Sequence, residues 1–137
     1  MSEGLLYLDS SALVKLVLPE AETGALLEAL SDWPERISSA LAGVEVLRAV
    51  RRAGAGKRVR ERAERVIAGI GLVRVDGAVL SGAARLEPAE LRTLDAIHLA
   101  TALSAGEDLG AMICYDAQLA QVAARLGVTM MAPGAKD

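Results

Sequence analysis

The chain of 137 residues contains no phenylalanine, one tryptophan and two tyrosines, so aromatic rings supply little of its apolar volume. Even so, 53% of its residues are hydrophobic, and these are mainly alanine, leucine and valine. This composition predicts a core of closely packed aliphatic helices and strands, and it excludes a core built around aromatic rings.

Cysteine is also scarce. The single residue, Cys114, excludes an internal disulfide and suits a reducing cytosol. No stretch reaches the roughly 18 consecutive apolar residues needed to span a bilayer. The first residues lack the basic segment that opens a signal peptide, and Glu3 stands in its place. We therefore expect a cytoplasmic protein that does not associate with membranes.

The length fits one domain with a hydrophobic core of its own. We expect this domain to cover residues 1–131 and the segment 132–137 to form a loose C-terminal tail. No internal repeat and no low-complexity segment interrupts the domain.

Short apolar runs alternate along the chain with longer segments of helical character. The predicted strands are residues 5–8, 36–38, 72–75, 111–115 and 128–131. The predicted helices are residues 10–18, 20–30, a segment capped by Ser38 or Ser39 that runs to Arg52, 57–68, 77–86, a segment capped by Thr93 that runs to Ser104, and 116–126. This alternation is typical of an α/β fold in which helices cover both faces of a parallel sheet.

Four acidic residues lie inside or at the end of apolar stretches, where a packed domain does not favour charge. They are Asp9, Glu45, Asp95 and Asp116. Asp9 and Asp116 each follow a predicted strand, so a parallel sheet places both at its carboxyl edge, where ligand sites form. Two carboxylates about 4 Å apart repel by roughly 4 kcal/mol at an effective dielectric near 20. A hard divalent cation, Mg²⁺ or Mn²⁺, would offset that repulsion.

Each acid also has a structural interpretation that the sequence leaves open. Asp9 and Asp116 can cap the helices that follow them. Asp95 lies in the first turn of its helix, where the helix dipole favours a carboxylate. Glu45 can pair with Arg48 at the edge of an apolar face. One metal site replaces these four separate explanations.

Several polar residues near the acids are candidates for supporting roles. Ser10, Ser11 and Thr93 can hydrogen-bond a carboxylate or a metal-bound water, and the same positions suit helix capping. We interpret His98 as a neutral core histidine or one at the rim of a pocket, and Cys114 as a small core residue.

The net charge of −3 argues against nucleic-acid binding, but the charges are segregated. The window 48–65 has eight basic and two acidic residues, a net +6, so the rest of the chain carries −9. Such a segment can meet a polyanion, although ion pairs on a solvated helix explain it equally well. The candidate contact residues for RNA or a protein partner are Arg48, Arg51, Arg52, Lys57 and Arg58.

Four segments together resemble the PIN domain family, and most closely the VapC toxins of VapBC toxin–antitoxin pairs. They are YLDSSALVK from Tyr7, the Glu45 segment SSALAGVE, LRTLDAIHLATAL from Leu91, and YDAQL from Tyr115. The resemblance covers essentially the whole chain. It implies a three-layer α/β/α sandwich around a parallel sheet that is commonly five-stranded.

By the same resemblance, Asp9, Glu45, Asp95 and Asp116 bind Mg²⁺ or Mn²⁺ in an endoribonuclease that leaves 5′-phosphate and 3′-hydroxyl ends. A homodimer and inhibition by a cognate VapB-type antitoxin are also implied. Many relatives have Thr or Ser where this chain has Cys114, which leaves the role of that position open. The alternatives are a non-catalytic PIN-like module that binds RNA or protein, and a phosphohydrolase with Asp9 as nucleophile.

Overall fold

The computed structural model describes residues 2–136 and contains a five-stranded sheet. The strands are β1 (Leu5–Leu8), β2 (Arg36–Ser39), β3 (Gly71–Val73), β4 (Leu109–Ile113) and β5 (Met130–Met131). All neighbouring pairs are parallel, and the order across the sheet is β3-β2-β1-β4-β5. Strand β1 therefore lies at the centre of the sheet, between β2 and β4.

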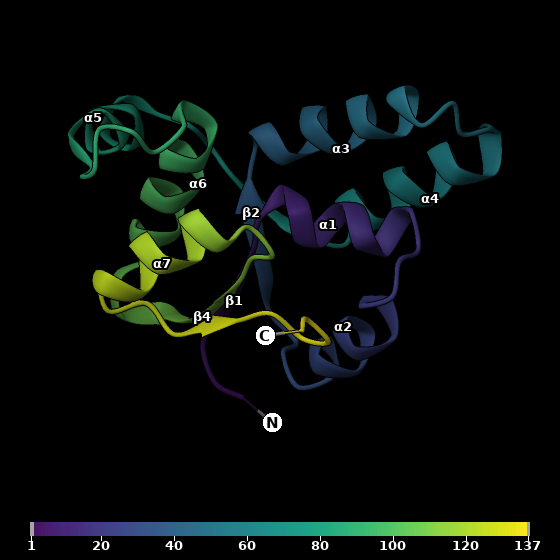
Figure 1. The fold of residues 1–137 in the computed structure, drawn as a ribbon, viewed down its shortest axis with the longest axis horizontal. Helices are drawn as coiled ribbons and strands as arrows, with labels where there is room; N and C mark the ends of the chain where they lie inside the picture. The colour runs from purple at the N-terminus through teal and green to yellow at the C-terminus, as the bar shows by residue number, and fades with distance from the viewer. Residues whose placement is uncertain (1, 137) are drawn as a thin grey trace.

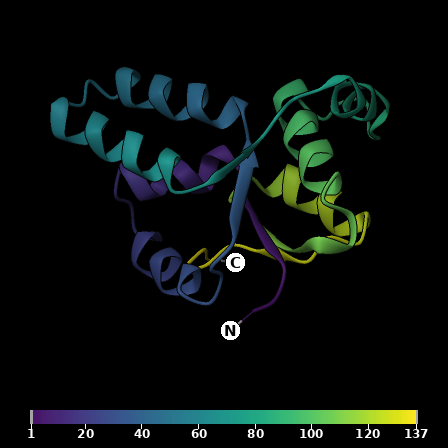
Figure 2. The same cartoon turned by 180° about the vertical axis from the view of Figure 1, so that it is seen from behind.

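Seven α-helices cover the two faces of the sheet. They are α1 (Ser10–Val17), α2 (Thr23–Leu30), α3 (Leu41–Arg52), α4 (Lys57–Ala68), α5 (Gly77–Arg85), α6 (Thr93–Leu103) and α7 (Ala117–Arg125), with a 3₁₀ turn, η1, at Gly106–Asp108. Helices α1 to α4 pack on one face and α5 to α7 on the other, as the front and back views show (Figures 1 and 2). The predicted three-layer α/β/α sandwich with a parallel five-stranded sheet is confirmed.

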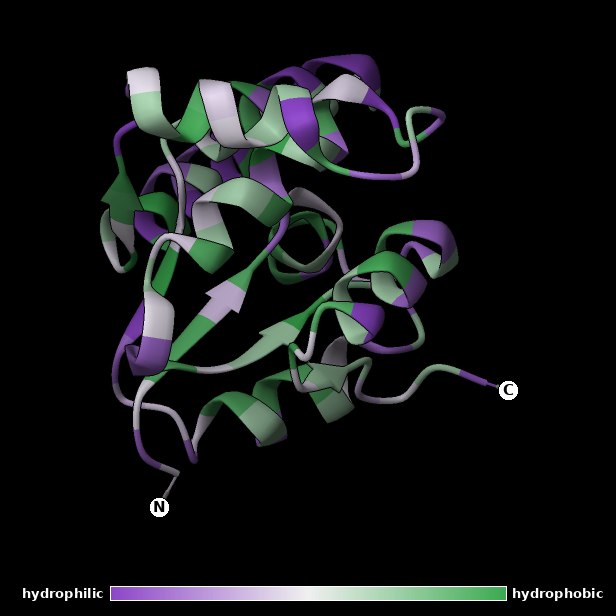
Figure 3. Ribbon diagram, turned by 90° about the vertical axis from the view of Figure 1, so that its left-hand side faces the viewer, coloured by the Kyte–Doolittle hydropathy of each residue, from purple (hydrophilic) through white to green (hydrophobic). Residues whose placement is uncertain are grey.

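The alternation of side chains along β1 explains the two layers of core. Leu6 and Leu8 point into the cluster formed with α1 to α4, whereas Tyr7 points into the cluster formed with α6 and α7. All three side chains are fully buried. Figure 3 shows hydrophobic residues along the strands, with hydrophilic ones gathered on the outer helices.

The predicted boundaries of β3 and β4 were wrong by one to two residues at their ends. Strand β3 ends at Val73, because its partner β2 ends at Ser39, which pairs with Val73. Strand β4 ends at Ile113, because its partner β1 ends at Leu8. Cys114 therefore lies just beyond the strand, and not inside it.

Two predicted helix caps were also wrong. Ser38 and Ser39 belong to β2, and Ala40 precedes α3, although Ser39 Oγ accepts a hydrogen bond from the Leu41 amide. Thr93 is the first residue of α6, and the capping position belongs to Arg92, whose backbone is extended.

Trp33, which follows α2, packs against the edge of the sheet at which the parallel strands begin. A Cβ atom on Gly110 in β4 would lie 2.5 Å from Cζ3 of Trp33 and 2.7 Å from the backbone oxygen of Glu3. Only glycine allows this close approach. No helix of the described residues is both long and apolar enough to cross a bilayer.

Candidate active site

Asp9 and Asp116 lie at the carboxyl ends of two neighbouring strands. Asp9 directly follows β1, and Asp116 comes three residues after the end of β4. Each is also the cap of the next helix: Asp9 Oδ1 accepts from the Ala12 amide at 3.0 Å, and Asp116 Oδ1 accepts from the Leu119 amide at 2.9 Å. The predicted shared edge and the predicted caps are thus both present. Capping occupies one carboxylate oxygen and leaves the second for another contact.

Asp9 is the most enclosed of the four acids, with 4% of its surface exposed. Ser11 Oγ donates to Asp9 Oδ1 at 2.6 Å and accepts from the Tyr115 amide at 3.0 Å, so it ties the β1 end to the loop after β4. Burial raises the pKa of Asp9, and hydrogen bonds from Ser11, Cys114 and Ala12 only partly oppose this effect. Among residues 2–136, no basic side chain forms an ion pair with Asp9.

Asp95 and Asp116 are joined by a residue that the sequence analysis did not single out. The Arg92 guanidinium donates to Asp95 Oδ2 at 3.0 Å and to Asp116 Oδ2 at 2.8 Å. The hydrogen bond and the charge of Asp95, together with the charge of Asp116, raise the pKa of Arg92. The signal in the sequence was the i, i+3 spacing of Arg92 and Asp95 at the start of a helix.

Glu45 is held by His98, and the predicted Glu45–Arg48 pair is absent from the ion pairs of residues 2–136. The Nε2 atom of His98 lies 2.7 Å from Glu45 Oε1 and 2.9 Å from Ser10 Oγ. Burial alone would raise the pKa of Glu45, but hydrogen bonds from His98 and Ser10 hold it below its ordinary value. His98 is 2% exposed, so the interpretation as a buried histidine agrees with its position.

Cys114 lies between the two strand-end acids. Its Sγ accepts from the Asp116 amide at 3.3 Å and donates to the Asp116 backbone oxygen at 3.4 Å. Burial, and the negative charge of Asp9, raise the pKa of the Cys114 thiol. Thr93 is exposed at the first residue of α6. Its predicted supporting role stays a prediction. Ser11 contacts Asp9 directly, and Ser10 contacts His98, the partner of Glu45.

The donor set can be tested against a hard divalent cation. The four acids offer only oxygen atoms, which is what Mg²⁺ and Mn²⁺ prefer. Within residues 2–136, however, no three Asp, Glu, His or Cys side chains lie close enough together to hold a metal ion. Asp95 and Asp116 already enclose one positive group, Arg92, and buried Asp9 has no cationic partner there. The chemistry of the donors fits the ion, and an ion bound there would compete with Arg92 for Oδ2 of Asp95 and of Asp116.

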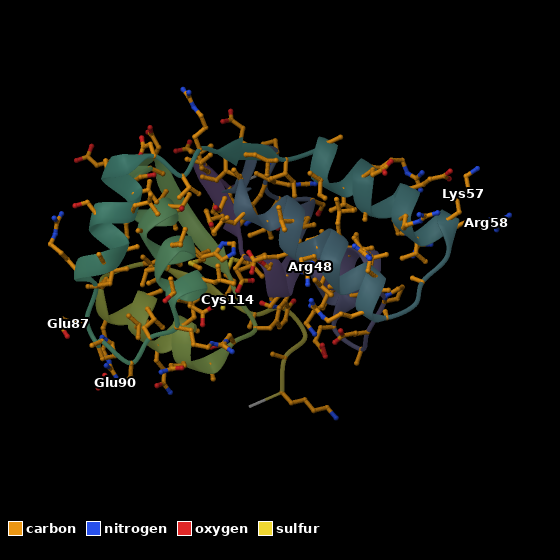
Figure 4. The ribbon with its side chains drawn as sticks, turned by 90° about the horizontal axis from the view of Figure 1, so that it is seen from above. Arg48, Lys57, Arg58, Glu87, Glu90 and Cys114 are labelled. Carbon is orange, nitrogen blue, oxygen red and sulfur yellow. The ribbon has the colours of Figure 1, made fainter. Side chains whose placement is uncertain are left out.

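The basic candidates form two groups along the hairpin of α3 and α4. Arg48, Arg51 and Arg52 line a hollow of about 250 Å³ on α3. Figure 4 looks down on the molecule from above and places Lys57 and Arg58 at the far end of the hairpin, away from Cys114. Lys57 pairs with Glu61 at 3.9 Å. Glu87 and Glu90 lie at the opposite end of the same view (Figure 4).

A PIN domain family model matches residues 6–127 of this chain. The chain belongs to the PIN domain family. This PIN domain is 48% identical to ribonuclease VapC46 of Mycobacterium tuberculosis (strain H37Rv), over 93% of this chain and 97% of that protein. It is 40% identical to ribonuclease VapC35 of the same species, over 95% of this chain and 98% of that protein. The resemblance drawn from four short segments is confirmed.

Solved structures agree on the fold of this PIN domain. Mycobacterium tuberculosis VapC20, described as a toxin that cleaves the sarcin–ricin loop, superposes with a TM-score of 0.73 at 17% identity, covering 93% of this chain and 99% of that one. A toxin–antitoxin complex from Klebsiella pneumoniae matches with a TM-score of 0.64 at 19% identity, covering 81% and 86%. At these identities the likeness concerns the fold.

Proposed function

We propose that this protein is a metal-dependent endoribonuclease and the toxin component of a type II toxin–antitoxin pair. One observation carries the proposal. A PIN domain that is 48% identical to a VapC ribonuclease over 93% of its length has Asp9 and Asp116 at the carboxyl ends of adjacent strands. Arg92 links Asp95 to Asp116, and His98 holds the Glu45 carboxylate, which comes from α3. The proposed ligands of Mg²⁺ or Mn²⁺ are these four acids.

The protein's own residues would prepare the site for phosphodiester hydrolysis. When bound, Mg²⁺ or Mn²⁺ supplies a Lewis acid that activates water and stabilises the leaving oxygen. Ser11 and the Ala12 amide fix the orientation of Asp9, and His98 fixes that of Glu45. Arg92, once released from Asp95 and Asp116, is free to contact an RNA phosphate.

Covalent catalysis by the enzyme is not required in this scheme. The Cys114 thiol is buried, and its raised pKa keeps it protonated, which makes it a poor nucleophile. Attack of water on the phosphorus, with cleavage of the P–O3′ bond and departure of the 3′ oxygen, would give the 5′-phosphate and 3′-hydroxyl products that the family resemblance implies.

The partners follow from the same proposal. Arg48, Arg51, Arg52, Lys57 and Arg58 are all exposed on the α3–α4 hairpin, and their charge suits an RNA backbone or an acidic segment of a VapB-type antitoxin. The solved relative from Klebsiella pneumoniae is itself a toxin–antitoxin complex. We propose a homodimer in the cytoplasm as the working form.

The decisive test measures cleavage by protein purified free of antitoxin. RNA incubated with Mg²⁺ or Mn²⁺ should be cut, and a chelator should stop the reaction. Asp9→Asn should lower the rate by about a hundredfold or more, because metal sites contribute several kcal/mol to such reactions. Asp32→Asn, an exposed change after α2, is the matched control and should cleave as the wild type does. Equal rates for Asp9→Asn and wild type would refute the metal assignment.

A non-catalytic module is the second candidate, and one observation favours it: no three potential ligands of residues 2–136 converge, and Arg92 spans two of the acids. Calorimetric titration with Mn²⁺ separates the two proposals. Binding that disappears in Asp95→Ala supports the nuclease. RNA binding without any Mn²⁺ binding supports the module.

A further inference from the structure

Three side chains from three different elements form one continuous chain of hydrogen bonds. Tyr7 of β1 lies 2.6 Å from His98 of α6, measured from the phenol oxygen to Nδ1. The other ring nitrogen of His98, Nε2, lies 2.7 Å from Glu45 Oε1 on α3. These two hydrogen bonds thus link β1, α6 and α3, and they end on Glu45, one of the proposed metal ligands.

Elementary hydrogen-bond chemistry sets the direction of this chain. An ionised carboxylate only accepts hydrogen bonds, so at 2.7 Å from Glu45 the Nε2 atom of His98 must carry the proton. A neutral imidazole then presents Nδ1 as its acceptor. The Tyr7 hydroxyl is the donor that Nδ1 meets. Tyr7 therefore selects the same tautomer of His98 that Glu45 requires.

Packing holds the ring in this orientation. Tyr7 is fully buried and His98 is 2% exposed, so water does not compete for the hydrogen bond between them. The two rings pack edge to face, with centroids 5.9 Å apart and planes at 78°. Glu45 is the only partly exposed member, and Ser10 Oγ braces the same Nε2 atom at 2.9 Å.

We propose that Tyr7 and His98 are positioning residues that hold the Glu45 carboxylate in place beside the proposed metal site. The inference rests on the proposed function, because it assumes that Glu45 is a ligand. Neither residue touches RNA or the metal in this scheme. Such supporting residues commonly change metal affinity by about tenfold to a hundredfold when removed.

The first test needs no variant. His98 is the only histidine of the chain, so a ¹⁵N-histidine spectrum reports this ring alone. The proposal predicts that the neutral ring has its proton on Nε2 and a hydrogen-bonded, unprotonated Nδ1, without added metal or RNA. A neutral ring with its proton on Nδ1 in the wild type would overturn the assigned direction.

The second test compares the only two tyrosines. Tyr7→Phe should shift the Nδ1 signal and weaken Mn²⁺ binding by about tenfold. Tyr115→Phe is the matched control, since the Tyr115 hydroxyl donates to Pro133 at 2.8 Å and not to His98. It should leave both the spectrum and the Mn²⁺ affinity unchanged.

A double-mutant cycle separates positioning from a general loss of structure. In a Glu45→Ala background, Tyr7→Phe should have no further effect on Mn²⁺ affinity, because its action passes through Glu45. An equal loss with and without Glu45 would overturn the proposal. A wild type that binds no Mn²⁺ would instead refute the proposed function, and with it the role of both residues, even where the spectrum shows the expected tautomer.

Discussion

Arg92 binds Asp116 across 24 residues of chain, with 2.8 Å between the guanidinium Nη2 and the carboxylate Oδ2. Its second hydrogen bond, to Asp95, makes it the positive charge around which two proposed metal ligands are gathered. Arg92 is largely exposed, so it can leave without disturbing the core. In the proposed metal site, the arginine and a metal ion would compete for the same oxygens.

This competition predicts the effect of Arg92→Gln. Removing the guanidinium should strengthen Mn²⁺ binding by about twofold to fivefold, because an exposed ion pair is a weak competitor. Calorimetry on the metal-free protein measures the change. Arg125→Gln, at the exposed end of α7, is the control and should bind as the wild type does. Weaker binding by Arg92→Gln would show that the arginine organises the site instead of blocking it.

Asp9→Asn should stabilise the metal-free protein. Asparagine keeps an oxygen that accepts from Ser11 and Ala12, but it removes a buried charge that has no cationic partner. A gain of roughly 1 kcal/mol would raise the melting temperature by about 2–5 °C. Thermal unfolding in the presence of a chelator measures it. An unchanged or lower melting temperature would contradict the view that the buried, unpaired charge of Asp9 destabilises the metal-free protein.

Among the four proposed metal ligands, the two with shifted pKa values, Asp9 and Glu45, predict opposite dependences of stability on pH. The folded pKa of Asp9 is raised above its ordinary value of 3.8, so its favourable contribution is present at low pH and is lost as pH rises through that folded pKa. The folded pKa of Glu45 is lowered from 4.5, so its contribution is present above 4.5 and is lost as pH falls through the folded pKa.

Urea unfolding at a series of pH values can separate these contributions. The stability advantage of Asp9→Asn over the wild type should grow as pH rises above 3.8 and then level off. A difference that stays constant across this range would mean that Asp9 titrates normally in the folded protein.

Arg48 and the pair Lys57 and Arg58 should differ in their effect on RNA binding. Arg48 lies nearer Cys114 (Figure 4), so neutralising it should weaken binding and lower the salt dependence by about 0.7 for one lost phosphate contact on single-stranded RNA. Lys57 and Arg58 lie at the distal end of the hairpin, so neutralising them should have a smaller effect (Figure 4). Filter binding at several salt concentrations, with catalytically impaired Asp9→Asn, makes the comparison. Equal losses would mean that RNA follows the whole hairpin.

The sequence predicted the architecture well because its signals are local. The apolar run 5–8 and the prolines and glycines between segments mark strands and helices without knowledge of their partners. Strand ends were less accurate, since β3 ends where β2 ceases to pair with it. The end of β3 at Val73 is therefore set by Ser39, a residue more than 30 positions earlier in the sequence.

The contacts of the acids could be predicted only in part. The caps made by Asp9 and Asp116 involve residues three positions ahead, and these were foreseen. The partner of Glu45 was not, because His98 lies 53 residues further along the chain. Arg92 was overlooked because its spacing to Asp95 is ordinary for a helix start, whereas its contact with Asp116 exists only in the folded chain.

The packing of Trp33 against Gly110 has a practical consequence. This indole is the chain's only one, and it lies at the edge of the sheet where β4 begins, whereas the acids lie where β1 and β4 end. Its fluorescence should therefore report on the packing of the sheet at the edge away from the carboxylates. A variant of those carboxylates that keeps the wild-type emission has kept this packing, which can be checked before its chemistry is assayed.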